Sequence, residues 1–152
     1  MSVLLVRHAH AGDRDAWIGP DHLRPLSMKG IQQAEALVFA LAGFEVGRVL
    51  SSTYLRCTQT VEPLALVRGV ALETEAALAE GNGASAAELV RSLAGSPVVL
   101  CTHGDVIGGI LSTTPAPEPW SMKKGSVWIL EADATTGRFV EARYLPPPGR
   151  LA

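Results

Sequence analysis

Short apolar segments alternate along this chain with segments whose apolar residues recur at helical spacing. Residues 2–6 (SVLLV) form an uninterrupted apolar run, which is typical of a strand buried on both faces of a sheet. Further strands are predicted at residues 47–51, 70–73, 98–101, 126–131 and 138–145, with a turn at 136–137 between the last two. Because strands and helices alternate, we expect a three-layer α/β sandwich whose mostly parallel central sheet carries helices on both faces.

The predicted helices follow several of these strands. Ser27 can accept a hydrogen bond from an early unpaired N–H, so it is placed to begin a helix whose apolar residues recur from Ile31 to Leu41. Gly43 is predicted to end that helix, and Pro63 to kink or split the next one over residues 54–67. Two shorter helices are predicted at residues 86–93 and 106–111, and loops at 12–25, 81–85 and 115–119.

Composition narrows the class of protein. The chain has 152 residues, about the size of one domain, and its 47% of hydrophobic residues is enough for a core. Thirteen Lys and Arg against fifteen Asp and Glu leave a net charge of −2, which gives no electrostatic footprint for nucleic acid or an anionic membrane. No apolar run approaches the roughly 20 residues that span a bilayer, and the N-terminus does not read as a signal peptide. We therefore expect a single cytoplasmic domain over residues 1–152, with Cys57 and Cys101 as buried free thiols.

Residues suited to phosphate chemistry follow three of the predicted strands. Arg7 and His8 directly follow the first strand, Arg56 opens the helix after residues 47–51, and His103 follows residues 98–101. Ligands of open α/β sheets bind outside the carboxyl ends of the strands, so these side chains can converge on one crevice. The planar fork of an arginine fits phosphate oxygens, and a neutral imidazole is a competent nucleophile. Each residue alone is more often a surface charge or a satisfied polar group, but together they favour a phosphoryl-binding site.

Four sequence blocks resemble the histidine phosphatase superfamily, also called phosphoglycerate-mutase-like. They are LLVRHA at residues 4–9, RPLSxxGxxQA at 24–34, SSxxxRxxQT at 51–60 and THG at 102–104, in the order and spacing of that family. The short chain and the Arg-His-Ala variant are similar to its compact branch, which contains the phosphohistidine phosphatase SixA. Some Nudix hydrolases carry a C-terminal domain of this pattern, but these 152 residues hold no Nudix half.

The resemblance implies a mechanism and assigns its residues. His8 would attack phosphorus and form a phosphohistidine intermediate, while Arg7, Arg56 and His103 hold the equatorial oxygens of the transferring group. These cations should lower the pKa of His8 and keep it neutral. No metal or other cofactor is implied, since His8 and His10 lie two residues apart without a third group of ligands.

The resemblance also implies a general acid in the loop after the third strand, where Glu80 matches the pattern. This acid would protonate an alkoxide leaving group and later deprotonate the attacking water. Asp105 is an alternative, although an Asp in the first turn of a helix is also stabilised by the helix dipole. Glu75 is a third candidate. The residues alone leave this choice open.

Two classes of function remain. The first is a phosphatase that acts on a phosphohistidine-bearing protein or a small phosphate ester, in a crevice left open by the short segment between Glu80 and the strand at 98–101. The alternative is a catalytically weak phosphate- or nucleotide-binding module, which would not need a neutral imidazole beside phosphorus. Arg14 is predicted to contact substrate at the rim. Other rim charges are interpreted as solvated: Arg24, Lys123 and Lys124.

Overall fold

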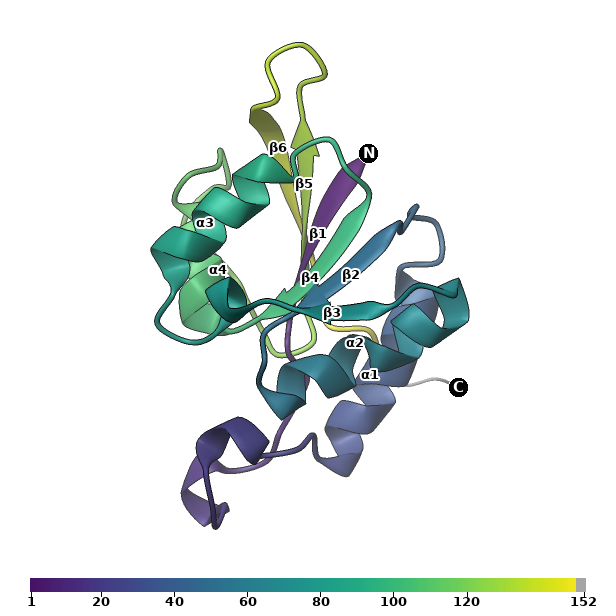
Figure 1. Ribbon diagram of the computed structural model, residues 1–152, viewed down its shortest axis with the longest axis vertical. Coiled ribbons are helices and arrows are strands. Elements are labelled where there is room, and N and C mark those ends of the chain that lie inside the picture. The colour runs from purple at the N-terminus through teal and green to yellow at the C-terminus, as the bar shows by residue number, and fades with distance from the viewer. Residues whose placement is uncertain (150–152) are drawn as a thin grey trace.

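All six predicted strands form, and they join into one sheet in the computed structural model, which describes residues 1–149 (Figure 1). Their order across the sheet is β3-β2-β4-β1-β5-β6. The strands are β1 (Ser2–Arg7), β2 (Arg48–Ser51), β3 (Leu72–Thr74), β4 (Val98–Thr102), β5 (Val127–Ala132) and β6 (Phe139–Leu145). The first four strands pair in parallel, and β5 and β6 add an antiparallel edge, so the sheet is mostly parallel as predicted.

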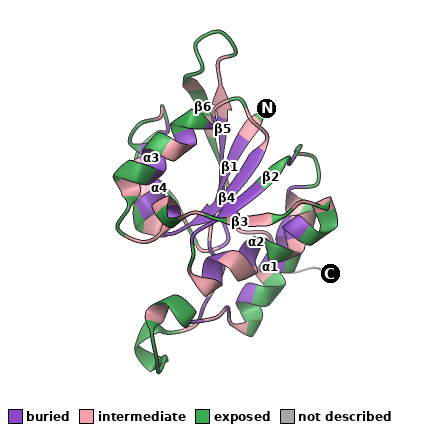
Figure 2. Cartoon of the chain, in the orientation of Figure 1, coloured by how far each residue is buried: buried purple, intermediate pink, exposed green. Residues whose placement is uncertain are grey.

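Helices cover both faces of this sheet. The helices are α1 (Met28–Ala40), α2 (Leu55–Arg68), α3 (Gly83–Ser92) and α4 (Gly104–Leu111). Alternate residues of β1 point to opposite faces, so Leu4 and Val6 pack with α1 and α2 while Val3 and Leu5 pack with α3 and α4. Figure 2 shows the central strands as the most continuously buried part of the chain. The predicted three-layer sandwich is therefore confirmed.

Local signals located the start of α1 better than its end. The Oγ of Ser27 accepts a hydrogen bond from the N–H of Gly30 at 3.1 Å, as its capping role predicts. The helix ends at Ala40, before Gly43, and Gly43 lacks the left-handed conformation expected of a terminator. On its predicted apolar face Ile31 is 42% exposed, and it lines a surface hollow together with Gln59 and Pro63 of α2.

Three other predictions about local structure are wrong. α2 runs unbroken through Pro63, because the buried residues Val61 and Leu64 on either side pack against the sheet and offset one missing backbone hydrogen bond. α3 begins at Gly83 and takes in part of the segment predicted as a loop at 81–85, where alanines favour the helix. Short 3₁₀ helices at Arg14–Ala16 and Asp21–Leu23 interrupt the loop predicted at 12–25. A third forms at Ala76–Leu78, for which no element was predicted.

The two cysteines lie in the core, and the helices are short. Cys57 and Cys101 are buried free thiols in the layer between the sheet and α2, as predicted. Over residues 1–149 no helix combines the length and the apolar character needed to cross a bilayer, and the longest, α2, has 14 residues.

The sheet brings the ends of its parallel strands to one edge. The ladder continues past each strand: the N–H of His8 donates to the carbonyl of Thr102 at 3.0 Å, and the N–H of Ser52 donates to the carbonyl of Cys101 at 2.9 Å. The N–H of Glu75 likewise donates to the carbonyl of Ser51 at 2.8 Å. The segments that follow β1, β2, β3 and β4 therefore start at the same level and can line one pocket.

Candidate active site

His8 lies buried at the carboxyl end of β1 with one ring nitrogen free. Its Nδ1 lies 2.8 Å from the carbonyl oxygen of Ala9, and because a carbonyl only accepts, Nδ1 carries the proton and Nε2 keeps its lone pair. Burial lowers the pKa of His8 from 6.5 to about 3. Electrostatic repulsion from Arg56, His103 and Arg7 contributes less to the same shift. The direction agrees with the sequence-based expectation, although burial contributes more than the cations. His8 is neutral at neutral pH.

A buried neutral imidazole makes folding stability depend on pH. His8 titrates near 6.5 in the unfolded chain and near 3 in the folded one, so between these values the unfolded state binds the extra proton. We expect His8 to reduce the free energy of unfolding by up to about 1.4 kcal/mol per pH unit as the pH falls through this window. Denaturant unfolding of the wild type and of His8→Asn across the window measures this, since only the wild type should show the added slope. Equal slopes in the two proteins would contradict it.

Arg7 projects from the end of β1 beside the first turn of α4. Its Nη1 donates to the carbonyl of Met122 at 2.7 Å, and its buried Nε–H has no protein partner within residues 1–149. A Cβ on Gly104 would lie 3.2 Å from the Cζ of Arg7, so the missing side chain of Gly104 makes room for the guanidinium. The arginine thus lines the pocket next to the N-terminus of α4, where an anion is favoured.

Arg56 is fully buried and its guanidinium is held on several sides. Its Cζ lies 4.8 Å from the centre of the Tyr54 ring. Nη1 donates to the carbonyl of Asp21 at 3.0 Å, and Nη2 lies 3.1 Å from the Asp21 carboxylate and 2.7 Å from that of Glu80. Asp21 also pairs with Arg24 at 3.1 Å. Sequence reasoning missed Asp21, because nothing distinguishes it from the other acidic residues of a loop.

His103 faces the pocket with a proton on Nδ1. Its Nε2 lies 2.9 Å from the Oγ of Ser52, which itself accepts a hydrogen bond from the N–H of Tyr54 at 3.2 Å. The hydroxyl proton of Ser52 is then available for Nε2, which leaves the ring proton on Nδ1, 3.4 Å from Glu80. The rings of His103 and His8 have centres 5.5 Å apart. Ser52 belongs to a motif seen in the sequence, but only the structure shows what it contacts.

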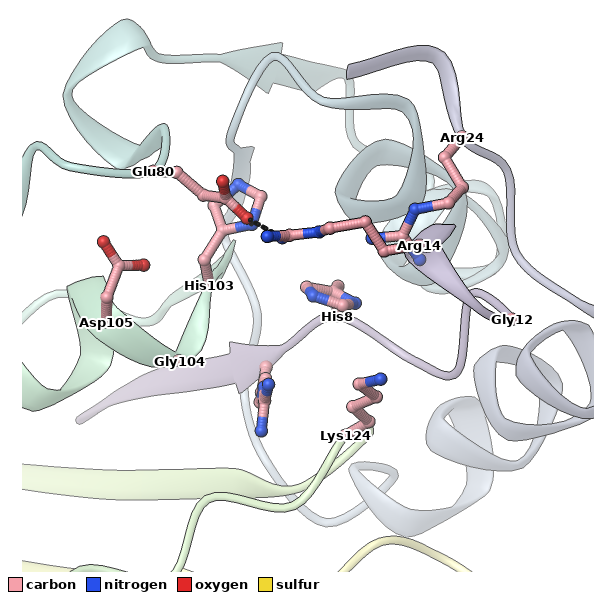
Figure 3. Close-up of a pocket in the computed structure, with 10 residues that line it drawn as sticks. His8, Gly12, Arg14, Arg24, Glu80, His103, Gly104, Asp105 and Lys124 are labelled. Carbon is pink, nitrogen blue, oxygen red and sulfur yellow. Dashed lines mark hydrogen bonds and ion pairs between the residues drawn. The ribbon is translucent and has the colours of Figure 1, made fainter. Parts of the chain in front are cut away.

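Of the three candidate general acids, Glu80 has the geometry that fits the role. Its Oε1 lies 2.7 Å from Arg56, 3.1 Å from Arg14 and 3.4 Å from His103, so the carboxylate stands inside the pocket (Figure 3). Asp105 also lines the pocket, but one of its oxygens accepts a hydrogen bond from the N–H of Gly81 at 2.8 Å and so holds the loop that carries Glu80. Glu75 is not among the residues that line the pocket.

Arg7, His8, Glu80 and His103 line a pocket of about 400 Å³ at the carboxyl edge of the sheet. Arg56 is fully buried and is not among the lining residues, and it meets the pocket through its contact with Glu80. Arg14 also lines the pocket and pairs with Glu80, and its contact with substrate stays a prediction. Two interpretations of surface charge are wrong: Arg24 is only 5% exposed and donates to the carbonyl of Ala11 at 2.8 Å, and Lys124 lines the pocket whereas Lys123 is exposed. Local sequence could not separate the two lysines, because adjacent residues of a loop point in directions that only the fold decides.

The remaining motif residues hold the segment that follows His8. The side chain of Gln33 accepts a hydrogen bond from the N–H of His10 at 2.8 Å. The hydroxyl of Thr60 accepts from the N–H of Ala9 at 2.9 Å and donates to the carbonyl of Arg56 at 2.7 Å. A Cβ on Gly30 would overlap the backbone oxygen of His10, so this position needs glycine. The described part of the chain contains no group of three or more His, Cys, Asp or Glu placed to bind a metal ion.

The fold and the pocket together define an α/β protein that presents a neutral histidine and several arginines at the carboxyl edge of its sheet. A family model described as histidine phosphatase superfamily (branch 1) matches residues 3–87, more than half of the chain. The chain therefore belongs to the histidine phosphatase superfamily. This confirms the resemblance drawn from the four sequence blocks.

Individual relatives add detail. An 8-oxo-(d)GTP phosphatase of Mycolicibacterium smegmatis is 39% identical over 97% of this chain but 48% of its own length, so the chain spans about half of that relative. The fold matches the protein histidine phosphatase SixA in complex with tungstate, with a TM-score of 0.82 and 22% identity over 97% of each chain. It also matches a putative phosphohistidine phosphatase SixA of Agrobacterium tumefaciens, with a TM-score of 0.77 and 22% identity over 96% of this chain and 97% of the other.

Proposed function

We propose that this chain releases phosphate from a phosphohistidine-bearing protein or a small phosphate ester, with His8 as the nucleophile and a phosphohistidine as the intermediate. Membership of the histidine phosphatase superfamily supports phosphatase activity. The observation that carries the mechanism is the buried, neutral His8, whose free Nε2 lies in a pocket shared with Arg7 and His103. The single sheet from Ser2 to Leu145 supports one such domain over residues 1–152.

In the first step Nε2 of His8 forms a bond to phosphorus as the bond from phosphorus to the leaving group breaks. Negative charge on the equatorial oxygens would be met by the free Nε–H of Arg7, the guanidinium of Arg56 and the Nδ1–H of His103. Substrate oxygens would compete with Glu80 for Arg56, which releases Glu80 to serve the leaving group. In its protonated form Glu80 would give its proton to a departing alkoxide.

In the second step a water molecule attacks phosphorus on the opposite side from His8. The Glu80 carboxylate left by the first step would take a proton from that water, and the bond from phosphorus to Nε2 breaks. Inorganic phosphate is released and His8 returns to its neutral form. The low pKa of His8 supports this step, because a weakly basic imidazole is a good leaving group.

A second candidate is a phosphate- or nucleotide-binding module with little turnover. In this structure Arg56 pairs with the carboxylates of Asp21 and Glu80. A binding module could exchange these carboxylates for a bound phosphate without hydrolysing it. Binding alone, however, does not require the unpaired lone pair on Nε2 of His8. This favours the phosphatase.

A substrate screen tests the proposal. We would measure kcat/KM for a phosphohistidine peptide, sugar phosphates, phosphoglycerates and nucleotides. A phosphatase turns over at least one of these classes, and its activity depends on His8. Saturable binding without release of phosphate from any of them would favour the binding module instead.

The role of Glu80 should depend on the leaving group. An alkoxide needs a proton, whereas phosphohistidine releases an imidazole whose conjugate acid has a pKa of about 6.5. We therefore expect Glu80→Gln to reduce ester hydrolysis by about 10²–10⁴-fold and phosphohistidine hydrolysis much less. Steady-state rates of both substrates at several pH values measure the difference.

Asp105→Asn is the matched control, because Asp105 contacts the same loop and its amide oxygen can still accept from Gly81. We expect its effect to be small and equal for the two substrates. A selective loss on esters in Asp105→Asn, with none in Glu80→Gln, would move the acid to Asp105. An equal loss on both substrates in Glu80→Gln would indicate positioning or water activation.

A further inference from the structure

Lys124 occupies a fixed place on the pocket wall that the proposed chemistry does not use. It precedes β5, and Figure 3 shows it on the other side of His8 from Glu80 and His103. Its carbonyl accepts a hydrogen bond from Gln33 at 3.3 Å. The next N–H, that of Gly125, lies 3.1 Å from the carbonyl of Arg7 and 3.2 Å from that of His8. The loop that carries Lys124 is thus tied to the backbone of the nucleophile.

The glycine after Lys124 is part of this arrangement. Gly125 has φ +85°, a left-handed conformation that side chains rarely adopt, and a Cβ there would lie 3.3 Å from the side-chain amide of Gln33. The turn therefore needs glycine to bring the lysine to the pocket. The backbone around the site therefore holds the partly exposed Lys124 where its side chain lines the pocket.

The ammonium of Lys124 lacks an anionic partner. The two carboxylates that line the pocket have other partners, Glu80 with Arg56 and Arg14, and Asp105 with Gly81. No ion pair joins Lys124 to any residue between 1 and 149. Partial burial and the surrounding arginines lower the pKa of Lys124. A lysine held among like charges without a counter-ion is unfavourable in the empty pocket, and an anionic ligand would relieve this repulsion.

A simple phosphate ester would leave that charge unmatched. In the proposed mechanism Arg7, Arg56 and His103 meet the oxygens of the transferring phosphoryl group. Lys124 and Arg14 are additional cations around the same pocket. The side chain of Arg14 is 62% exposed and pairs with Glu80, so a substrate oxygen would compete with Glu80 for it, as proposed for Arg56. Their natural ligand is a second anionic group carried by the leaving part of the substrate.

We propose that Lys124 and Arg14 form a second anion subsite that binds a phosphoryl group on the leaving side, so that phosphoanhydrides such as nucleoside diphosphates are the preferred substrates. This rests on the proposed function. With ADP, His8 would bond to the terminal phosphorus, the bond to the bridging oxygen would break, and AMP would leave with that oxygen. Water would then release phosphate from His8. AMP departs as a phosphate anion and needs no proton from Glu80.

ADP and AMP make a matched pair of probes, because they share a nucleoside but only ADP has a leaving group that carries phosphate. We expect Lys124→Gln to lower kcat/KM for ADP by about tenfold or more, mainly through KM, and to change that for AMP little. Lys123→Gln is the control, since it removes the same charge from the exposed neighbouring residue. It should affect neither substrate.

Three outcomes would overturn the subsite: equal losses on ADP and AMP in Lys124→Gln, no loss on either, or the same ADP-selective loss in Lys123→Gln. Calorimetric binding of ADP and AMP to both variants separates this failure from failure of the proposed function. If the wild type hydrolyses nothing, the proposed function fails. The subsite still stands in that case if Lys124→Gln selectively weakens binding of ADP, and falls if it does not.

Discussion

Replacing His8 with alanine is expected to abolish turnover, by at least about 10⁴-fold, while the fold is retained. The reason is that Nε2 of His8 would form the covalent bond to phosphorus. His103, the other histidine that lines the pocket, has its Nε2 turned toward Ser52. Wild-type protein stopped during turnover should carry an acid-labile, base-stable phosphoryl label. The label should be absent from His8→Ala.

His22→Ala is the matched control for this experiment, because His22 is an exposed histidine of the neighbouring loop. It should keep both turnover and label. Near-UV circular dichroism and thermal unfolding of His8→Ala would check that the core is intact. A label on Ser or Cys, or a label that survives in His8→Ala, would contradict the assignment of the nucleophile.

Replacing Arg56 with alanine is expected to cost on the order of 3–4 kcal/mol of transition-state stabilisation, a loss of about 10²–10³-fold in kcat/KM. Arg56 is fully buried, and its guanidinium is oriented by Asp21 and by the ring of Tyr54, so it is preorganised for charge that develops on the transferring group. Arg56→Lys should recover little of the loss, since an ammonium cannot reproduce the two directed contacts of a fork. Steady-state kinetics of the three proteins measures this.

Stability has to be followed in the same variants. Arg56→Ala removes the fully buried cation that pairs with both Asp21 and Glu80, so its melting temperature should fall. Arg48→Ala removes an arginine from an exposed pair with Glu73 and should change neither kcat/KM nor stability appreciably. If kcat/KM of Arg56→Ala matched the wild type, Arg56 would be a structural residue and the proposed transition-state contacts would be wrong.

Much of the fold could be predicted because it depends on local patterns. The run at residues 2–6 became β1, the alternating residues 126–131 and 138–145 became the antiparallel pair β5 and β6, and Ser27 capped α1. Pro63 misled the local analysis, since burial of its neighbours outweighs one lost hydrogen bond. The segment at 81–85 misled it too, because its glycines suggested a loop where α3 begins.

The candidate site divides in the same way. Their positions at the ends of predicted strands were enough to select Arg7, His8, Arg56 and His103, because parallel strands end at one edge of the sheet. The family resemblance added Glu80 as one of three candidate acids. The structure brings all five together; their catalytic roles stay predictions. The choice of Glu80 over Asp105 needed the structure, since both lie in the pocket and only their hydrogen-bond partners differ.

The sequence by itself therefore determined the three-layer fold, the family and the edge of the sheet where the site lies. Hydrophobic periodicity and strand-end motifs are local properties of the sequence, so they can be recognised without knowing the tertiary structure. Only the tertiary structure decided that Asp21 holds Arg56, that Ser52 contacts Nε2 of His103, and that Lys124 lines the pocket while Lys123 is exposed. Each of these facts is a contact between distant segments, or a direction in a loop, and no local pattern encodes either.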